Sequence, residues 1–552
     1  MAAQMSGQPI YILSEGSQRY LGRDARRMNI LASRVIAEAV KSTLGPKGMD
    51  KMLVDSTGEI VITNDGAAIL KKVDVKHPAA KMIVEIAKTQ EKEVGDGTTT
   101  AVVLAGELLK RAEELLEQEV HAASIAKGYR LAKEETIRIL EDLSKKVKGT
   151  EDELKKVAMT SLSSKASGTL AREHIAALAT TSVKRIAEKR DGKFTIDKDN
   201  IKIQKQVGES TSESRLIEGI VLDKERAHTG MPKVVTNARI ALSKVEIKIK
   251  KTETDAKLDI SSPEQLQSFM KEEEETLKEM AMKIKKSGAN VLFCQKDLDD
   301  IALYTLSKEG ILVVKSVAEK DIKLIAKATG ASIITSLEDI NAGDLGNAKR
   351  VEEKKIGGKE FIFIEGCSKP KAVTIFLRGG SEHVLDGVER SLDDAISVVR
   401  NVLEDSSVLP GGGASEAEVA RQLRKFSTKV SGREQLALLE FANALEVVPR
   451  TLAENGGLDP IDAMIGLRTQ HEKGNVNYGI DLASGKPRDM YKLGIVDSLR
   501  VVQQAVKSAT EVANMVLRID DVIAAKGALG GGEETPSMPP GGMEGMGGMG
   551  GM

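Results

Sequence analysis

The sequence has 552 residues, a length that predicts three or four domains and excludes a single small binding module. Hydrophobic residues make up 41% and charged residues 30%, which is typical of folded domains with a heavily ionised surface. The 81 Lys and Arg residues nearly balance 82 Asp and Glu residues, and a net charge of −1 gives no global field for nucleic acid or an anionic membrane. We therefore expect neither as a partner.

Cysteine usage and hydropathy indicate the compartment. Cys294 and Cys367 are too few for a disulfide framework or a four-thiolate zinc site, and they favour a reducing environment. The first thirty residues lack an apolar core of signal-peptide length, and no run approaches the ~20 apolar residues that cross a bilayer. We expect a soluble, cytoplasmic protein.

The predicted elements change character along the chain. Residues 25–150 have apolar residues at three- and four-residue spacings, which predicts a helix-rich region. Short β-branched runs then predict strands at 201–207, 245–249, 291–293, 311–314 and 332–334. Helical patterns at 297–307 and 318–328 separate the last three runs, so we expect a small parallel α/β core. Helices resume after about residue 384 and run to about 526 with one irregular break.

The order helix, α/β, helix predicts a helical base built from both chain ends, with the α/β unit inserted through a connecting region. Three independent domains would need flexible linkers near residues 150 and 375, and the sequence has none there. The segment from Gly530 to Met552 is rich in Gly and Met, and we expect it to be disordered.

Residues 250–286 join a polar stretch to a marked helix start, with Ser262 as the expected N-cap and Pro263 as the first helical residue. Phe269 and Met270 lie next to the charged run 271–275. One interpretation, which the periodicity alone favours, is an amphipathic helix packed on its own domain. The other is a protrusion whose apolar side meets a partner.

The segment Gly-Asp-Gly-Thr-Thr-Thr at 95–100 lies between two helical patterns and opens the helix expected from 101 to 119. Its glycines allow close backbone approach, and hydroxyl side chains beside unpaired N–H groups at a helix start are typical of a phosphate site. Asp96 is placed to hold Mg²⁺ against the same phosphates. The alternative is a glycine turn with a threonine N-cap.

Three further turns are candidate ligand loops. Residues 44–51 follow a helical pattern and either wrap a ligand or stop a helix. Residues 63–66 follow a strand-like run, and a hairpin turn would explain Asp65. Residues 411–413 are three glycines that open a helix, as in an anion cradle, or form a linker. No Walker A motif occurs, and no G-x-G-x-x-G follows a strand, so those two nucleotide folds are not expected.

In order and separation, the segments 44–51, 64–66, 95–100, 393–395 and 411–413 resemble the ATP site of the chaperonins. Ser163-Ser164-Lys165, the inserted segment near 250–285 and the Gly/Met tail resemble the archaeal and eukaryotic-cytosolic branch (group II), most closely archaeal thermosome subunits. The resemblance covers essentially the whole chain.

This resemblance implies a multidomain α+β fold. It implies a helical equatorial ATP-binding domain from residues 1–150 and 406–528 and an intermediate hinge domain from 151–219 and 370–405. It also implies an α/β apical domain at 220–369, with a helical protrusion at about 248–285, and a disordered tail at 529–552.

The resemblance also implies an ATP/ADP site with Mg²⁺. Asp96 would ligate the metal, and Asp394 would activate the attacking water with Asp65 beside it. The implied nucleotide-binding residues are Leu44, Gly45, Pro46, Gly97, Thr98, Thr99, Thr100, Ser163, Ser164, Lys165, Gly412, Asp481, Ala483 and Asp497. The residues alone leave two alternatives open: Lys165 as an ordinary surface charge, and Asp393 in place of Asp394, since both aspartates lie off the apolar stripe of their helix.

The implied function is ATP-driven folding of non-native polypeptides in two stacked rings of identical or paralogous subunits, with the protrusions as a built-in lid. We expect Asp96 and Asp394 to meet only when the subunit closes, so that ATP state drives motion. A nucleotide-regulated ring or filament scaffold is the alternative, although it would not need both aspartates. A small-molecule kinase would need an acceptor pocket, for which the sequence has no motif.

Overall fold

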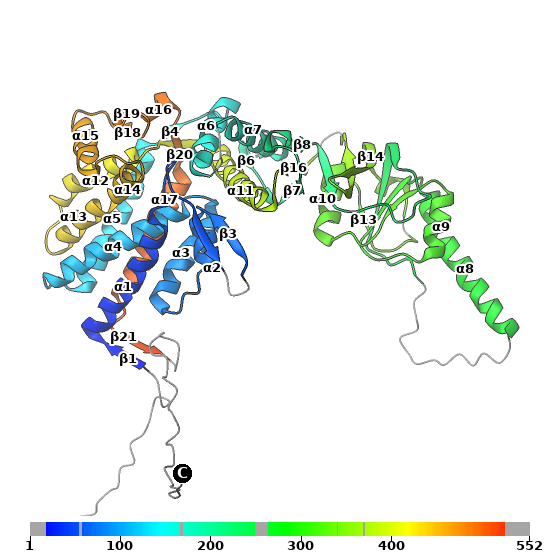
Figure 1. Ribbon diagram of the computed structural model, residues 1–552, viewed down its shortest axis with the longest axis horizontal. Coiled ribbons are helices and arrows are strands. Elements are labelled where there is room, and N and C mark those ends of the chain that lie inside the picture. Colours follow the sequence, from blue (N-terminus) through cyan, green and yellow to red (C-terminus); the bar gives the residue numbers. More distant parts are fainter. Residues whose placement is uncertain are drawn as a thin grey trace, which may run out of the picture.

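The computed structural model describes residues 18–54, 58–165, 169–248, 263–338, 340–367 and 370–524. Three parts follow one another along the long axis of the molecule (Figure 1): a helical part, a smaller connecting part, and a part built on a sheet from which a long helix projects. The tail for which we expect disorder lies outside the described residues, as do residues 249–262 of the expected protrusion.

Both ends of the chain build the helical part, as predicted. Its helices are α1 (Gly22–Lys41), α2 (Gly66–Lys72), α3 (Pro78–Val94), α4 (Thr98–Glu117) and α5 (Ala122–Leu143), then α12 (Ala414–Ser427), α13 (Glu434–Leu445), α14 (Val447–Asn455), α15 (Pro460–Glu472), α16 (Met490–Leu493) and α17 (Leu499–Leu517). One hydrophobic cluster joins the two sets, with Leu104, Phe441 and Val506 buried in it. Apolar burial shared by both chain ends therefore holds this part together.

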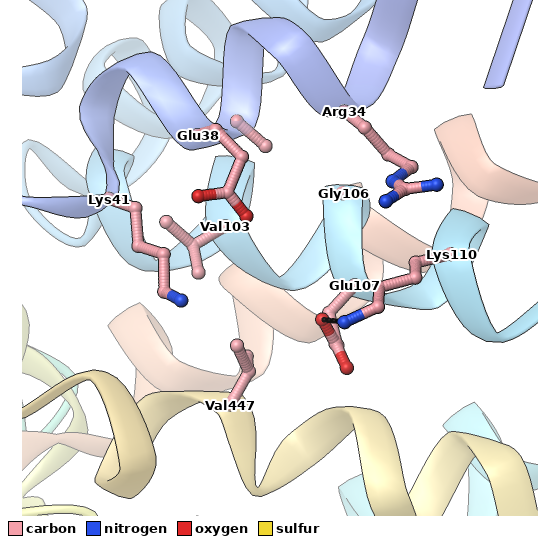
Figure 2. A pocket seen from close by; sticks show the side chains of 9 residues that line it. Arg34, Glu38, Lys41, Val103, Gly106, Glu107, Lys110 and Val447 are labelled. Carbon is pink, nitrogen blue, oxygen red and sulfur yellow. Dashed lines mark ion pairs between the residues drawn. The ribbon is translucent and has the colours of Figure 1, made fainter. Parts of the chain in front are cut away.

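Helices α1 and α4 cross at close range. A Cβ at Gly106 would lie 2.3 Å from the Cβ of Ala37, so only glycine fits at this crossing. Beside it is a small pocket that Arg34, Glu38 and Lys41 line from α1 and Glu107 and Lys110 from α4 (Figure 2). The pocket holds about 10 Å³, which is room for a single water. We assign it no function.

Short strands interrupt the helical part, so the prediction of helices to about 526 with one break is wrong in detail. Strands β2 (Lys51–Val54) and β3 (Ile60–Thr63) form a hairpin, as do β18 (Tyr478–Asp481) and β19 (Lys486–Asp489). Strand β17 (Ser407–Pro410) pairs with β20 (Val496–Ser498) and β4 (Lys145–Lys146). Helix α17 ends at Leu517, and β21 (Asp521–Ala524) then pairs with β1 (Gln18–Leu21) at the other end of the chain.

The connecting part combines helices with a three-stranded sheet. Its elements are α6 (Glu151–Ser161), the 3-10 turn η1 (Leu162–Ser164), α7 (Thr169–Ile186), β5 (Glu188–Arg190), β6 (Lys193–Thr195), β7 (Ile201–Val207), β8 (Arg215–Ile217), β16 (Val373–Gly379) and α11 (Glu382–Asp405). Strand β16 lies between β7, which is parallel, and β8, which is antiparallel. Leu154, Ile175 and Leu392 bury the helices against this sheet.

A seven-stranded sheet forms the third part. It contains β9 (Gly219–Leu222), β10 (Val234–Ser243), β11 (Val291–Cys294), β12 (Leu312–Val314), β13 (Ile333–Ile334), β14 (Gly346–Ile356) and β15 (Lys359–Glu365), with α9 (Asp300–Lys308) and α10 (Glu319–Thr329) as connections. Strands β10, β11, β12 and β13 run parallel, which confirms the predicted α/β core, and β14, β15 and β9 add an antiparallel edge.

The predicted strand at 245–249 is wrong, and β10 just before it was missed. At Ser243 both sides of β10 are already paired, with Cys294 on β11 and Ile334 on β13. Both of these neighbouring strands end there, so the next residues have no strand to pair with, and Ile247 makes only an isolated bridge to Leu298. A β-branched run does not become a strand where no neighbouring strand is left to pair with it.

Helix α8 (Pro263–Lys286) projects from this part at the far end of the molecule (Figure 1). It begins at Pro263, as predicted. Its later half packs through Ala281 and Ile284 on the sheet part, and Leu277 is also buried, while Met270 in its earlier half is 60% exposed. The interpretation as a helix packed on its own domain therefore holds for the later half of α8, and the interpretation as a partner-binding protrusion stays a prediction for the earlier half.

Candidate functional site

The loop between α3 and α4 has the geometry that its two glycines predict. Gly95 and Gly97 have φ values of 76° and 77°, a left-handed conformation that favours glycine. Gly97 is itself the N-cap of α4, and no side chain caps this end of the helix. The alternative of a threonine N-cap is therefore wrong, because Thr98 is already the first helical residue and the amides of the first turn are left to a ligand or to water.

Asp65 lies beside this helix start. The hairpin interpretation of residues 63–66 is wrong, because the turn of that hairpin falls between Val54 and Ile60. Asp65 is instead the N-cap of α2 and accepts hydrogen bonds from the amides of Ala67 and Ala68. The hydroxyl of Thr98 donates to its Oδ1 over 3.4 Å, so the junction between β3 and α2 meets the start of α4.

Lys165 joins two aspartates that are far apart in the sequence. Its Nζ lies 3.1 Å from Oδ1 of Asp96 and 2.5 Å from Oδ2 of Asp394. Its side chain is only 12% exposed, so the alternative of an ordinary surface charge is wrong. One ammonium group thus bridges Asp96 and Asp394 in this conformation, and the expectation that they meet only on closure stays a prediction.

The structure also distinguishes the two neighbouring aspartates on α11. Asp393 is 48% exposed and pairs with Lys198 on the outer side of the helix. Asp394 is 14% exposed and faces Lys165. Helical spacing could not separate them, because both positions lie off the buried stripe that contains Leu385 and Ala395.

The charged groups around Lys165 shift one another's pKa values. Burial alone would lower the pKa of Lys165, but the carboxylates of Asp394, Asp96 and Asp65 raise it. Burial raises the pKa of Asp394 well above its ordinary value, as do its acidic neighbours, and Lys165 opposes this only in part. Burial would also raise the pKa of Asp96, but Lys165, Ser161 and the amide of Gly97 outweigh it and lower this pKa.

These charges fit a magnesium ion that phosphate oxygens and water help to bind. Three carboxylates, Asp65, Asp96 and Asp394, face one ammonium group, so the cluster carries excess negative charge. Within the part of the chain that the structure describes, no three His, Cys, Asp or Glu side chains could hold a metal by themselves. Mg²⁺ commonly takes one or two carboxylates and keeps waters, so the Asp96 carboxylate suits it without a full protein cage.

The glycine run 411–413 lies near a second acidic group. Asp497 on β20 pairs with Leu409 on β17, and a Cβ at Gly411 would lie 3.0 Å from its Oδ2. Burial raises the pKa of Asp497 to about 7, with further contributions from Glu416 and Asp96. Asp497 is therefore within electrostatic range of the start of α12 and of the loop that contains Asp96. Sequence reasoning missed Glu416, because a glutamate in the first turn of a helix is ordinary.

Gly412 has a φ of 64°, and its carbonyl accepts a hydrogen bond from the amide of Ile480 on β18. Asp481 at the end of that strand accepts from the amide of Ala483 and from the hydroxyl of Ser484. Its carboxylate is therefore occupied in holding its own turn. This turn and the glycine run nevertheless lie side by side.

The segment at 44–46 is tied to the same side of the helical part. Asn455 donates to the carbonyl of Leu44 over 2.8 Å, and Lys47 donates to the carbonyl of Leu482 over 3.3 Å. Gly45 has a φ of 86°, and a Cβ there would lie 2.3 Å from Leu452. Pro46 follows it in this turn, which therefore lies beside the loop that contains Ala483.

Ser163 and Ser164 form part of η1, directly before Lys165. The carbonyl of Ser164 accepts a hydrogen bond from the side chain of Asn64, and the carbonyl of Ser163 accepts one from Arg172. Thr99 and Thr100 lie in the first turn of α4, and Thr99 is next to Gly66. The expected residues therefore fall into two groups, one around Lys165 and one around Gly412, with Asp497 between them.

Comparisons with known proteins identify the family of the chain. Residues 36–527 match the model of the TCP-1/cpn60 chaperonin family. The chain is 56% identical over 543 residues to thermosome subunit alpha of Archaeoglobus fulgidus, covering 98% of this chain and 99% of the relative. It is 55% identical over 540 residues to a thermosome subunit of Pyrococcus horikoshii, covering 96% and 98%. The open-state monomer of a group II chaperonin from Methanococcoides burtonii matches with a TM-score of 0.58 and 42% identity, over 77% of this chain and all of that one.

A helical base formed from both chain ends, with a sheet part inserted through a hinge, is the architecture of a chaperonin subunit. The chain belongs to the TCP-1/cpn60 chaperonin family. The resemblance to group II chaperonins, the multidomain fold and the chaperone function are thereby confirmed. No helix among the described residues is long and apolar enough to cross a membrane.

Proposed function

We propose that this chaperonin subunit hydrolyses ATP at the site around Lys165 and uses the cycle to enclose non-native polypeptides. The observation that carries the proposal is the bridge from Lys165 to Asp96 and Asp394, beside an uncapped helix start. Burying a lysine between two carboxylates from different parts of the fold costs desolvation free energy. Stability alone therefore does not explain this cluster.

Each group has a role that its position supports. Asp96 holds Mg²⁺, which when bound neutralises phosphate charge. The amides of Thr98, Thr99 and Thr100 bind phosphate oxygens at the start of α4, next to Gly97, whose own amide donates to Asp96. Asp394, with Asp65 beside the same helix start, orients the attacking water and accepts its proton. No covalent nucleophile is needed.

The remaining residues complete the nucleotide site. Asp497 accepts hydrogen bonds from ribose hydroxyls, and Gly412 allows the nucleotide to approach the backbone. Leu44, Gly45, Pro46, Asp481 and Ala483 form the surrounding pocket wall. Lys165, with Ser163 and Ser164 before it, senses the terminal phosphate, because a bound phosphate competes with the two aspartates for its ammonium group.

The same arrangement links the chemistry to motion. Lys165 and Asp394 belong to the connecting part, whereas Asp96 belongs to the helical part. A change of partner at Lys165 therefore changes what holds the two parts together. We propose that residues 1–150 with 406–528, 151–219 with 370–405, and 220–369 are the equatorial, intermediate and apical domains, and that the apical domain moves as the lever.

We further propose a cytoplasmic assembly of two stacked rings of identical or paralogous subunits, in which α8 and the residues before it form the lid. The second candidate, a scaffold regulated by nucleotide, is disfavoured because it would need no water-orienting carboxylate. Confinement would protect a polypeptide from aggregation while it folds.

The decisive experiment replaces Asp394 by Ala and compares it with Asp393→Ala. We expect Asp394→Ala to lower steady-state ATP turnover about 100-fold or more, since a positioned base contributes that much, while ATP binding by calorimetry and ring assembly by electron microscopy persist. Asp393→Ala should retain turnover, because Asp393 pairs outside the site with Lys198. Normal hydrolysis by Asp394→Ala would remove the catalytic assignment. Equal losses in both variants would assign the effect to α11 as a whole.

A further inference from the structure

One short segment of the connecting part touches four separate pieces of the site. The hydroxyl of Thr160 accepts a hydrogen bond from the amide of Val496, the residue before Asp497. Ser161 donates to Asp96, Ser164 accepts from Asn64, and Lys165 contacts both Asp96 and Asp394. Residues 160–165 therefore reach both ends of the nucleotide site.

Ser161 makes a specific contact within this set. Its Oγ lies 2.6 Å from Oδ2 of Asp96, a charge-assisted hydrogen bond of short length. The other oxygen, Oδ1, accepts from the amide of Gly97 over 2.8 Å and from Lys165 over 3.1 Å. Ser161 is thus the one described residue with a hydrogen bond to Oδ2.

The distribution of hydrogen-bond donors over the two oxygens of Asp96 becomes important when Lys165 moves away from this carboxylate. If Lys165 turns to a phosphate, Oδ1 keeps the Gly97 amide and Oδ2 keeps the Ser161 hydroxyl. One donor on each oxygen fixes the plane of the carboxylate, so its remaining lone pairs keep a defined direction. Without Ser161 the carboxylate would be held at one oxygen only and could rotate.

The position of Ser161 is well determined. It is the last residue of α6, whose first turn carries a capping box formed by Thr150 and Glu153. Leu154 and Val157 bury the helix in the core of the connecting part. A rigid helix therefore presents the hydroxyl to a loop that belongs to the helical part.

We infer that Ser161 is a positioning residue that orients the Asp96 carboxylate for its divalent cation. The inference rests on the proposed function, since it takes Asp96 to be the metal ligand. It adds a residue outside the motifs that suggested the site, and it assigns the orientation of the metal ligand to the connecting part.

The test measures metal binding instead of turnover. Mn²⁺ is titrated into ADP-loaded protein, and free Mn²⁺ is followed by electron paramagnetic resonance. We expect Ser161→Ala to weaken Mn²⁺ affinity about 10-fold, the lower end of the effect for residues that orient metal ligands. Ser161→Cys, which keeps the volume but is a weak donor, should lose a similar factor, and Ser161→Thr should restore affinity because it keeps the hydroxyl.

Two controls separate the possible failures. Ser144→Ala removes an exposed hydroxyl that bonds only to Glu141 in its own turn, and it should leave Mn²⁺ affinity unchanged. ADP affinity in EDTA should be the same in all variants. The inference is overturned if Ser161→Ala binds Mn²⁺ with wild-type affinity. It is also overturned if Ser161→Thr loses as much Mn²⁺ affinity as Ser161→Ala. Either result leaves the proposed function intact. If the unmodified protein binds no Mn²⁺ with ADP, the proposed function fails as well.

Discussion

Lys165 shows how a single side chain can connect distant parts of a chain. It is 69 residues from Asp96 and 229 from Asp394, yet it contacts both. Each aspartate belongs to a motif that the sequence identifies, but nothing in the sequence pairs them through a lysine. The residues of the site could therefore be predicted, whereas their mutual contacts depend on tertiary packing.

A second buried acid supports the helical part and gives a pH prediction. Glu418 on α12 is fully buried and accepts hydrogen bonds from Arg421 and Gln422, with Nδ1 of His471 2.9 Å from its Oε2. Burial would raise the pKa of Glu418, but these partners lower it to about 2. Because the folded-state pKa lies below the ordinary value of 4.5, its stabilisation is present above pH 4.5 and is lost as pH falls toward 2.

We predict that Glu418→Gln lowers the free energy of unfolding at pH 7 by about 1 to 3 kcal/mol. The difference from the unmodified protein should shrink between pH 4.5 and pH 2, where Glu418 becomes protonated. Chemical unfolding at a series of pH values measures this. Glu117→Gln, on the exposed end of α4, is the control and should change little. A difference that stays constant down to pH 2 would contradict the role of the charge.

At the scale of elements, helix α11 packs directly against the loop that contains Asp96. A Cβ at Gly95 would lie 2.2 Å from the Cβ of Ser397, and Asn401 donates to the carbonyl of Val94 over 2.9 Å. The helix that carries Asp394 is thereby fixed against the end of α3. This contact explains why the first glycine of the motif is needed apart from any ligand.

We predict that Gly95→Ala pushes α11 away and lowers ATP turnover about 100-fold, the loss expected for a catalytic group displaced by about 1 Å. The double variant Gly95→Ala with Ser397→Gly should recover part of the turnover, because it removes the clash but not the left-handed φ. Gly192→Ala is the matched control, since Gly192 has a φ of 81° with open space around it. Gly192→Ala should lower the free energy of unfolding by about 1 to 2 kcal/mol, because alanine is strained at a left-handed φ, but it should leave ATP turnover unchanged. Equal activity in Gly95→Ala and Gly192→Ala would argue against this contact.

Elements were predictable where local pattern and burial agree. The strands at 201–207 and 291–293 and the helices that separate the parallel strands match the periodicity of apolar residues. Strand β10 was missed because Asn237 and Arg239 interrupt its apolar run, although the sheet pairs it on both sides. The turn at 63–66 was misassigned because Asn-Asp-Gly suits both a hairpin and a helix start.

At the scale of the whole molecule, helix α8 projects at the far end of the sheet part, whereas the elements that carry the proposed ATP site, α4 and α11, lie in the helical and connecting parts (Figure 1). Phe269 and Met270 in the outer half of α8 are 37% and 60% exposed. Exposed apolar side chains on a projecting helix favour contact with another chain over packing within this one. The order of the three parts followed from the sequence, but their relative placement did not, because it depends on tertiary contacts such as the packing of Val94 and Val501 in the core of the connecting part.

We predict that replacing both Phe269 and Met270 by Lys leaves ATP turnover unchanged but reduces protection of a bound polypeptide from protease several-fold. The apolar contacts of the lid would be lost, while the ATP site is untouched. Protease digestion of a labelled substrate in the presence of ATP measures protection. The exposed Glu279→Gln on the same helix should behave like the unmodified protein. Full protection by the double variant would show that this surface does not contribute to closure.

Strands β1 and β21 place Gln18 directly opposite Ala524. The first and last described residues are thus neighbours, and a short linker between these positions would span only the width of one strand pair, about 5 Å. The subunit is therefore a natural subject for circular permutation: new ends could be opened in an exposed turn such as the one at Gly192, while the joined strands keep the helical base intact.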